Sequence, residues 1–129
     1  MSTPIIDDKP LVWMGSSLED LLAFPDEVKR GVGHALRFAQ GGEKHPDATP
    51  LHGYKGAGVL EIIEDFMGDT YRAVYTVRFS GIVYVLHAFQ KKSRQGIKTP
   101  PKEIAMVDRR LRSAAAHYAE WSRQQAQEQ

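Results

Sequence analysis

One stretch, residues 59–92, constrains the fold of this chain more than any other part of the sequence. It contains three runs rich in aliphatic, β-branched and aromatic residues, at Val59–Phe66, Thr70–Phe79 and Ile82–Phe89. This composition is typical of β-strands, and the breaks between the runs are short enough to be turns. Because short connections favour antiparallel neighbours, the stretch predicts a small antiparallel sheet.

Side chains alternate between the two faces of a strand, and this alternation separates the charges of the middle run. One predicted face carries Tyr71, Ala73, Tyr75, Val77 and Phe79. The opposite face carries Arg72, Val74, Thr76 and Arg78. The second face is therefore either a solvated side of the sheet or a concave cationic surface for a ligand that carries phosphate.

The segments before and after this sheet have helical spacing. A stripe within 26–40 consists of Val28, Val32, Ala35, Leu36 and Ala39, and one within 101–121 consists of Ile104, Val107, Leu111, Ala114, Ala115, Tyr118 and Trp121. The basic residues Arg109, Arg110 and Arg112 are expected on the outer side of the last helix.

Further local signals complete the expected order of elements. Ser16 and Glu19 match a capping box before a short helix near 17–23, and Leu11–Met14 has the composition of an edge strand. Gly31 and Gly33 are expected to let the 26–40 helix pack closely against the 17–23 helix. The predicted fold class is α+β, with a small antiparallel sheet, an N-terminal helical hairpin and a C-terminal helix.

Length and composition favour an ordinary globular protein. The chain has 129 residues, of which 42% are hydrophobic and 26% charged, so we expect one domain with flexible ends at 1–9 and 122–129. The formal net charge is only +1, so a cationic site must arise from local clustering. Absence of cysteine excludes disulfides and fits a reducing compartment. With no signal-peptide pattern and no apolar run near the ~20 residues that span a bilayer, we expect a cytoplasmic protein without membrane contact.

Four basic residues from separate parts of the sequence, Lys55, Arg72, Lys91 and Lys92, can meet at one face or rim of such a sheet. RNA cleavage by the 2′-hydroxyl requires in-line geometry, removal of a proton and stabilisation of charge on the phosphate. Lysine can take the proton when neighbouring cations depress its pKa, and arginine binds phosphate oxygens bidentately. The five histidines lack recognised metal-ligand spacing, so neither a metal site nor a cofactor is expected.

The order of features resembles the RelE/ParE superfamily of toxin–antitoxin toxins, and within it the HigB-like, phage Gp49-like branch. The resemblance covers roughly residues 10–120. It rests on Leu51-x-Gly53, Gly58-Val-Leu-Glu61-Ile, Tyr71-Arg72-Ala-Val-Tyr75, Val85-Leu-His87-Ala-Phe89-Gln-Lys91-Lys92-Ser93 and Thr99-Pro100 before Glu103-Ile104. It implies a type II toxin that acts as a ribosome-dependent, metal-independent mRNA endoribonuclease and is neutralised by an antitoxin, expected to be of the helix-turn-helix type.

The resemblance also assigns residues. Arg72 matches the family arginine that binds the scissile phosphate, and Lys55 lies in the loop where relatives place a catalytic lysine or histidine. Lys91 and Lys92 match a basic family motif and complete the expected catalytic set. The expected RNA-binding residues are Arg78, Arg94, Lys98 and His87. His87 is also the candidate for the late tyrosine or histidine that relatives use for stacking or acid–base work.

Two other functions stay open at this point. One is a ParE-like gyrase poison, which generally lacks such a basic set. The other is a non-catalytic binding module that only pairs with an antitoxin or DNA. Arg72 itself has an alternative role, as an exposed ion pair with Glu61 or Glu64 that contributes only about 0–1 kcal/mol.

Overall fold

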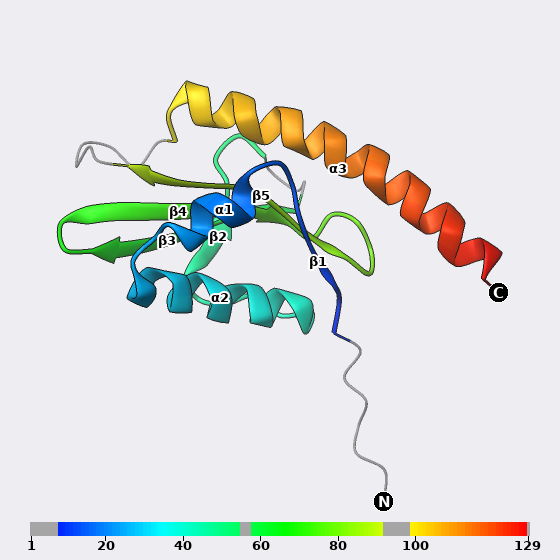
Figure 1. Ribbon diagram of the computed structural model, residues 1–129, viewed down its shortest axis with the longest axis horizontal. Helices are drawn as coiled ribbons and strands as arrows, with labels where there is room; N and C mark the ends of the chain where they lie inside the picture. The colour runs from blue at the N-terminus through cyan, green and yellow to red at the C-terminus, as the bar shows by residue number, and fades with distance from the viewer. Residues whose placement is uncertain (1–7, 55–57, 92–98, 129) are drawn as a thin grey trace, which may run out of the picture.

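The computed structural model describes residues 8–54, 58–91 and 99–128, and it has the predicted α+β architecture (Figure 1). The elements in chain order are β1 (Leu11–Trp13), α1 (Ser17–Leu22), α2 (Asp26–Gln40), β2 (Ala48–Pro50), β3 (Val59–Phe66), β4 (Asp69–Thr76), β5 (Val83–Lys91) and α3 (Pro101–Gln127). The three main strands and all three predicted helices are present. β2, inside the long segment predicted as a loop, is additional.

The sheet is mixed rather than wholly antiparallel. Its five strands lie in the order β1-β5-β4-β3-β2, and the β3–β4 and β4–β5 pairs are antiparallel as predicted. The additional strand β2 pairs antiparallel with β3. β1 does lie at the edge, but it runs parallel to β5, with Leu11 opposite Val83 and Trp13 opposite Val85. Parallel pairing is available because β1 and β5 are far apart in sequence and no tight turn has to join them.

Helices cover both faces of the sheet, so the molecule has three layers. Figure 1 shows the sheet between α2 on one side and α3 on the other. Tyr71, Ala73 and Tyr75 of β4 belong to the core under α1 and α2, whereas Val74 belongs to the core under α3 with Val107. The predicted solvated or concave cationic face is therefore wrong as a description of the whole face, because α3 packs on it.

A β-bulge in β5 decides which side chains reach α3. Val74 lies opposite His87, but the next residue, Tyr75, lies opposite Val85, so Leu86 is the extra residue on β5. A bulge interrupts strict alternation, and here Leu86 and His87 both face the α3 layer. Phe79 departs from the predicted alternation as well. β4 ends at Thr76, and the Phe79 ring packs against Tyr118 of α3.

α3 is longer than expected. The helix continues to Gln127, so the residues predicted to fray from 122 onward are helical up to that point. Trp121 lies against the β4–β5 connection, where a Cβ on Gly81 would be 3.4 Å from the indole ring. Ala115, predicted to pack on the sheet, is exposed. No helix within the described ranges 8–54, 58–91 and 99–128 has the length and apolarity needed to cross a membrane.

Two local predictions in the N-terminal half are wrong. Gly31 approaches β3 rather than α1, because an added Cβ would be 2.6 Å from the Glu64 carboxylate. Gly33 has no neighbour within that range. Ser16 is the N-cap residue of α1, but its hydroxyl makes no capping bond, since it is engaged with other side chains described below.

Candidate functional site

The candidate site lies between the sheet and the first turns of α3. Arg72 on β4 is directly opposite Phe89 on β5, and directly opposite residues share a face of the sheet. Lys91 is two positions beyond Phe89, so it shares that face too. The fold thus brings together two members of the predicted catalytic set, Arg72 and Lys91, on neighbouring strands.

Arg72 forms a buried ion pair with Glu61 of β3. Its Nη1 lies 3.3 Å from both carboxylate oxygens of Glu61. Glu61 is opposite Val74, which makes it a diagonal neighbour of Arg72, within reach of two long side chains. Thr99 joins the pair: its hydroxyl donates to Glu61 Oε2 at 3.0 Å and accepts from Arg72 Nη1 at 3.4 Å.

The burial of this pair contradicts the exposed role considered from the sequence. The side chains of Arg72 and Glu61 are only 4% and 7% exposed. The partner is Glu61 and not Glu64, because Glu64 points to the opposite face, towards Gly31 of α2. A buried pair is much more sensitive to loss of one partner than a surface pair, since the remaining charge stays desolvated.

His87 is held in one protonation state by two partners from α3. Its Nε2 lies 3.3 Å from Glu103 Oε1, and its Nδ1 lies 3.3 Å from Arg110 Nη1. Arginine can only donate, so Nδ1 accepts and Nε2–H donates to the Glu103 carboxylate. Desolvation by burial is the main cause that lowers the pKa of His87, and the positive charge of Arg110 also lowers it, whereas Glu103 opposes the shift. His87 is therefore a neutral, buried imidazole, stacked on Phe89.

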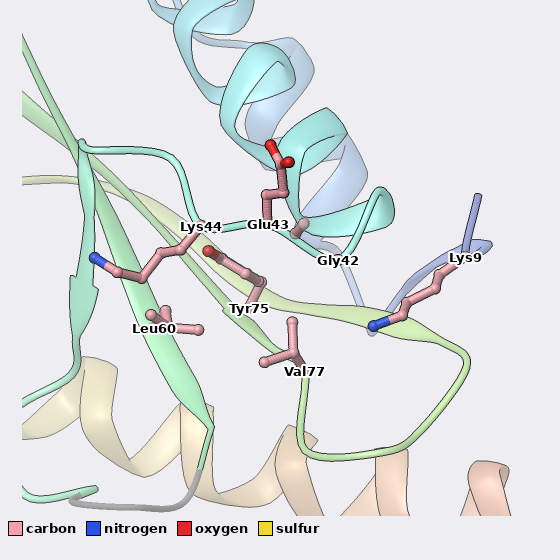
Figure 2. Close-up of a pocket in the computed structure, with 8 residues that line it drawn as sticks. Lys9, Gly42, Glu43, Lys44, Leu60, Tyr75 and Val77 are labelled. Atoms are coloured by element: carbon pink, nitrogen blue, oxygen red, sulfur yellow. The ribbon is translucent and has the colours of Figure 1, made fainter. Parts of the chain in front are cut away.

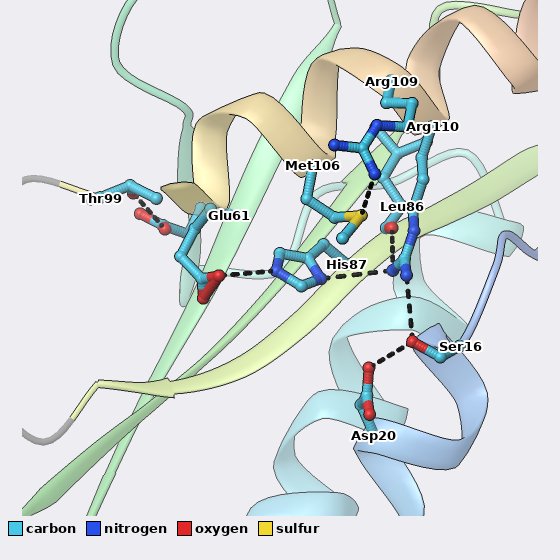
Figure 3. Close-up of polar contacts among 10 residues, drawn as sticks. Ser16, Asp20, Glu61, Leu86, His87, Thr99, Met106, Arg109 and Arg110 are labelled. Carbon is cyan, nitrogen blue, oxygen red and sulfur yellow. Dashed lines mark hydrogen bonds and ion pairs between the residues drawn. The ribbon is translucent and has the colours of Figure 1, made fainter. Parts of the chain in front are cut away.

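The contacts of Arg110 extend this polar cluster to α1 (Figure 3). Its guanidinium donates to the Leu86 carbonyl at 3.1 Å and to the Ser16 hydroxyl at 3.0 Å. The Ser16 hydroxyl in turn donates to Asp20 at 2.8 Å. One side chain of α3 thus links the bulge of β5 to the start of α1, which explains why Ser16 does not cap its helix.

The remaining predicted site residues are not all brought together. Arg78 follows the end of β4 that is farther from Arg72, so the two arginines are not neighbours. Lys91 is half-buried at the end of β5. Four predicted residues, Lys55, Lys92, Arg94 and Lys98, lie outside the described residues.

Two described residues mark the ends of the segment that contains Lys55. The Tyr54 hydroxyl donates to the carboxylate of Asp108 on α3. Burial raises the pKa of Tyr54 to about 12, and Asp108 adds to this effect. Gly58, on the other side of the segment, packs against Arg78, where an added Cβ would be 3.1 Å from the Arg78 nitrogen. Arg78, one of the predicted RNA-binding residues, thus lies beside a described end of this loop.

Sequence reasoning missed three residues of the site: Thr99, Glu103 and Arg110. A signal for the last two was present, because residues 103, 107, 110 and 114 follow helical spacing and share the stripe of Val107 and Ala114. The sequence prediction instead expects Arg110 on the outer side of the helix with Arg109 and Arg112. Among the residues that the structure describes, no group of three or more histidines and carboxylates could hold a metal ion.

Of the comparisons with known proteins, the match to a protein-family model is the one that supports a family. A search of curated protein sequences found no significant match. Among solved structures, a chain in the crystal structure of the toxin–antitoxin complex RelBE2 from Mycobacterium tuberculosis is similar, with 19% sequence identity and a TM-score of 0.41. That match covers 69% of this chain and 98% of the mycobacterial chain. The model of the family of phage-derived Gp49-like proteins matches residues 19–112, which is more than half of the sequence. The chain therefore belongs to the family of phage-derived Gp49-like proteins.

Proposed function

We propose that this protein is the toxin of a type II toxin–antitoxin pair and that it inhibits translation by cleaving mRNA on the ribosome. The observation that carries the proposal is the placement of Arg72 and Lys91 on one face of neighbouring strands. Both residues stand in the segments that resemble the nuclease motifs of the RelE/ParE superfamily. Membership of the Gp49-like family is consistent with this proposal.

In this proposal Arg72 binds the scissile phosphate and stabilises the charge that grows on it. The resting partner of Arg72 is the Glu61 carboxylate, which has the same single negative charge as a phosphodiester. An RNA phosphate that takes the place of Glu61 keeps Arg72 paired, and the displaced Glu61 carboxylate keeps the Thr99 hydroxyl as a donor. Arginine suits this exchange, because its planar fork binds carboxylate and phosphate alike.

Lysines supply the remaining functions in the proposed reaction. Lys91 is the last residue of β5 and shares the face of Arg72, and the next residue in the sequence is Lys92. One lysine of the set formed by Lys55, Lys91 and Lys92 accepts the 2′-hydroxyl proton, and the others bind the RNA backbone. The 2′-oxygen then attacks the phosphorus to form a 2′,3′-cyclic phosphate, and the 5′-oxygen leaves as a hydroxyl after taking a proton from a protonated lysine of the same set, without need of a metal ion.

The proposed partner is a small antitoxin that covers the same cations. An acidic or amphipathic segment complements a cationic groove, and its binding would exclude RNA. The antitoxin is expected to carry a helix-turn-helix domain, so the complex binds operator DNA through the antitoxin. Specific operator binding by this chain alone would contradict that division of roles.

The test is induced expression in a bacterium, followed by mapping of mRNA 5′ ends with translation running and with translation blocked. New 5′ ends that require translation are the expected result. The matched variants are Arg72→Met, in a background with Glu61→Leu that leaves no buried charge, and Arg30→Met on the exposed side of α2. Arg72→Met with Glu61→Leu should remove the new 5′ ends, and Arg30→Met should leave them unchanged.

Three other outcomes would refute the nuclease proposal. New 5′ ends that persist in the Arg72→Met variant would exclude the proposed site. Growth arrest with DNA breaks and intact mRNA would favour a gyrase poison. Absence of any growth effect would favour a non-catalytic binding module.

A further inference from the structure

A second site candidate lies on the opposite face of the sheet, under the C-terminal end of α2. A cavity of about 230 Å³ is found there, between the residues that follow α2 and the strands β3 and β4 (Figure 2). Its lining includes Lys9, Gly42, Lys44, Leu60, Tyr75 and Val77. Tyr75 faces this side and Arg72 faces the other, so the cavity is separate from the proposed nuclease site.

The informative group in this cavity is the hydroxyl of Tyr75. Tyr75 is only 1% exposed, yet its hydroxyl makes no hydrogen bond with any of the described residues. Tyr75 lines the cavity, so a molecule bound there can reach this hydroxyl. Burial raises the pKa of Tyr75 to about 12, so the phenol keeps its proton at neutral pH and acts as a donor. The hydroxyl oxygen is not one of the fully buried polar atoms that lack a partner, so it opens into the cavity, where a bound acceptor can take its hydrogen bond.

The charges around the cavity favour an anionic acceptor. In Figure 2 Lys9 and Lys44 lie on opposite sides of Tyr75, and the Lys44 ammonium group points away from the Tyr75 hydroxyl, towards β2. The ammonium group of Lys44 donates to the Ala48 carbonyl, and Lys9 has no side-chain partner among the described residues. Glu43 also borders the cavity, but its carboxylate points away from Tyr75 in Figure 2.

The rest of the lining is apolar, since Leu60, Val77 and Ala39 contribute only hydrocarbon. A ligand that contacts both the polar and the apolar residues of the cavity therefore combines one acid group with an apolar group.

We propose that this cavity binds a carboxylate that carries a small apolar group. The carboxylate accepts the hydrogen bond of Tyr75 and is attracted by Lys9 and Lys44. The apolar group covers Leu60 and Val77. The same chemistry is present in a free organic acid and in an acidic side chain of a peptide, and the experiment below separates these sources.

The test uses methyl NMR of the full chain, with the signals of Leu60 and Val77 as reporters. Phenylacetate is the probe for a free acid, and N-acetyl-glutamate N-methylamide is the probe for a peptide side chain. Phenylacetamide has the same shape as phenylacetate without the charge, so it is the control ligand. Phenylacetate or the glutamate derivative is expected to shift both methyl signals saturably, and phenylacetamide is expected to bind at least tenfold more weakly.

Tyr75→Phe is the decisive variant, because it removes only an unpartnered hydroxyl and should fold as well as the parent. It is expected to weaken phenylacetate binding by roughly tenfold or more, since hydrogen bonds to charged groups are the stronger ones. Tyr71→Phe is the matched control, because Tyr71 lies on the same face of β4, packs on Phe24 and does not line the cavity. Lys9→Gln and Lys44→Gln should each weaken binding, and Lys29→Gln on α2 should not.

The results assign the site or reject it. Tighter binding of phenylacetate indicates a free acid as the natural ligand, and tighter binding of the glutamate derivative indicates a protein side chain. Equal binding of phenylacetate to the Tyr75→Phe and parent proteins would overturn the proposal. Equal binding of phenylacetamide, or no binding of either acid, would overturn it as well. None of these readings depends on nuclease activity.

Discussion

Removal of Arg72 is expected to destabilise the protein strongly, because its partner Glu61 would remain buried without a counter-charge. The Glu61 side chain is 7% exposed and keeps only the hydroxyl of Thr99 as a donor from this cluster. Breaking a buried pair on one side costs about 3–5 kcal/mol. For a domain of this size, each kcal/mol lowers Tm by roughly 4 °C, so Arg72→Met should lower Tm by roughly 12–20 °C.

Replacing both partners should restore most of that loss. Glu61→Leu with Arg72→Met puts hydrocarbon where the two charges were, and such replacements of buried pairs are often neutral or stabilising. We therefore expect the free energy of unfolding of the double variant to lie within about 2 kcal/mol of the parent. Urea denaturation of the parent, both single variants and the double variant gives the coupling energy directly.

The control is the surface pair formed by Lys29 and Asp26, in which the Asp26 side chain is 84% exposed. The same cycle there should give a coupling below about 1 kcal/mol. The reasoning is refuted if the Arg72–Glu61 coupling is as small as that of Lys29–Asp26. The double variant has a second use, since it separates the loss of RNA cleavage from the loss of folding.

Three further predictions concern single groups. The pKa of His87 is lowered on folding, so unfolding takes up a proton as pH falls below about 6.5. The free energy of unfolding of the parent should therefore decrease below that pH. Urea titrations should show a flatter pH profile for His87→Gln. Tyr54→Phe removes the bond to Asp108 and should cost about 1–2 kcal/mol in urea denaturation, whereas an unchanged midpoint would show that this contact does not hold the loop end. Burial, followed by the nearby Asp47, raises the pKa of Glu64 above 4.5, so its charged form destabilises the folded protein at pH 7. Glu64→Gln should therefore raise Tm at pH 7 but not at about pH 4. A gain in Tm that is independent of pH would contradict this.

The sequence predicts the strand and helix order of this protein because the period of the apolar residues changes at nearly every boundary. The β3 run matches Val59–Phe66 at both ends, and α2 matches 26–40. β2 was not predicted, since Ala48–Pro50 is three residues long and contains a proline at the sheet edge. The direction of β1 was also beyond prediction, because a short edge strand can pair in either sense with a distant partner.

The candidate site was less predictable than the fold, because charge is a weak guide to exposure. Alternation correctly placed Arg72 on the face opposite that of Tyr75. It could not show that α3 would cover this face or that Arg72 would form a buried pair with Glu61 of β3. Arg110 is the same case on a helix, since its neighbours in the inner stripe are apolar and its charge is satisfied by Leu86 and Ser16. A bulge is not visible in residue type, so the approach of His87 to α3 needed the structure.

The parallel pairing of β1 with β5 has a consequence for the order in which the chain folds. Leu11 pairs with Val83, and the Ser17 hydroxyl donates to the Val85 carbonyl, so the first strand and the first helix both dock on the last strand. During synthesis these N-terminal elements must wait for β5 before they can bury their apolar side chains. Closing such a long loop is entropically costly, so we infer that this edge forms late, after the β3–β4–β5 meander has assembled. A nascent chain that ends before β5 thus lacks the strand on which β1 and α1 pack, and its sheet stays open at that side.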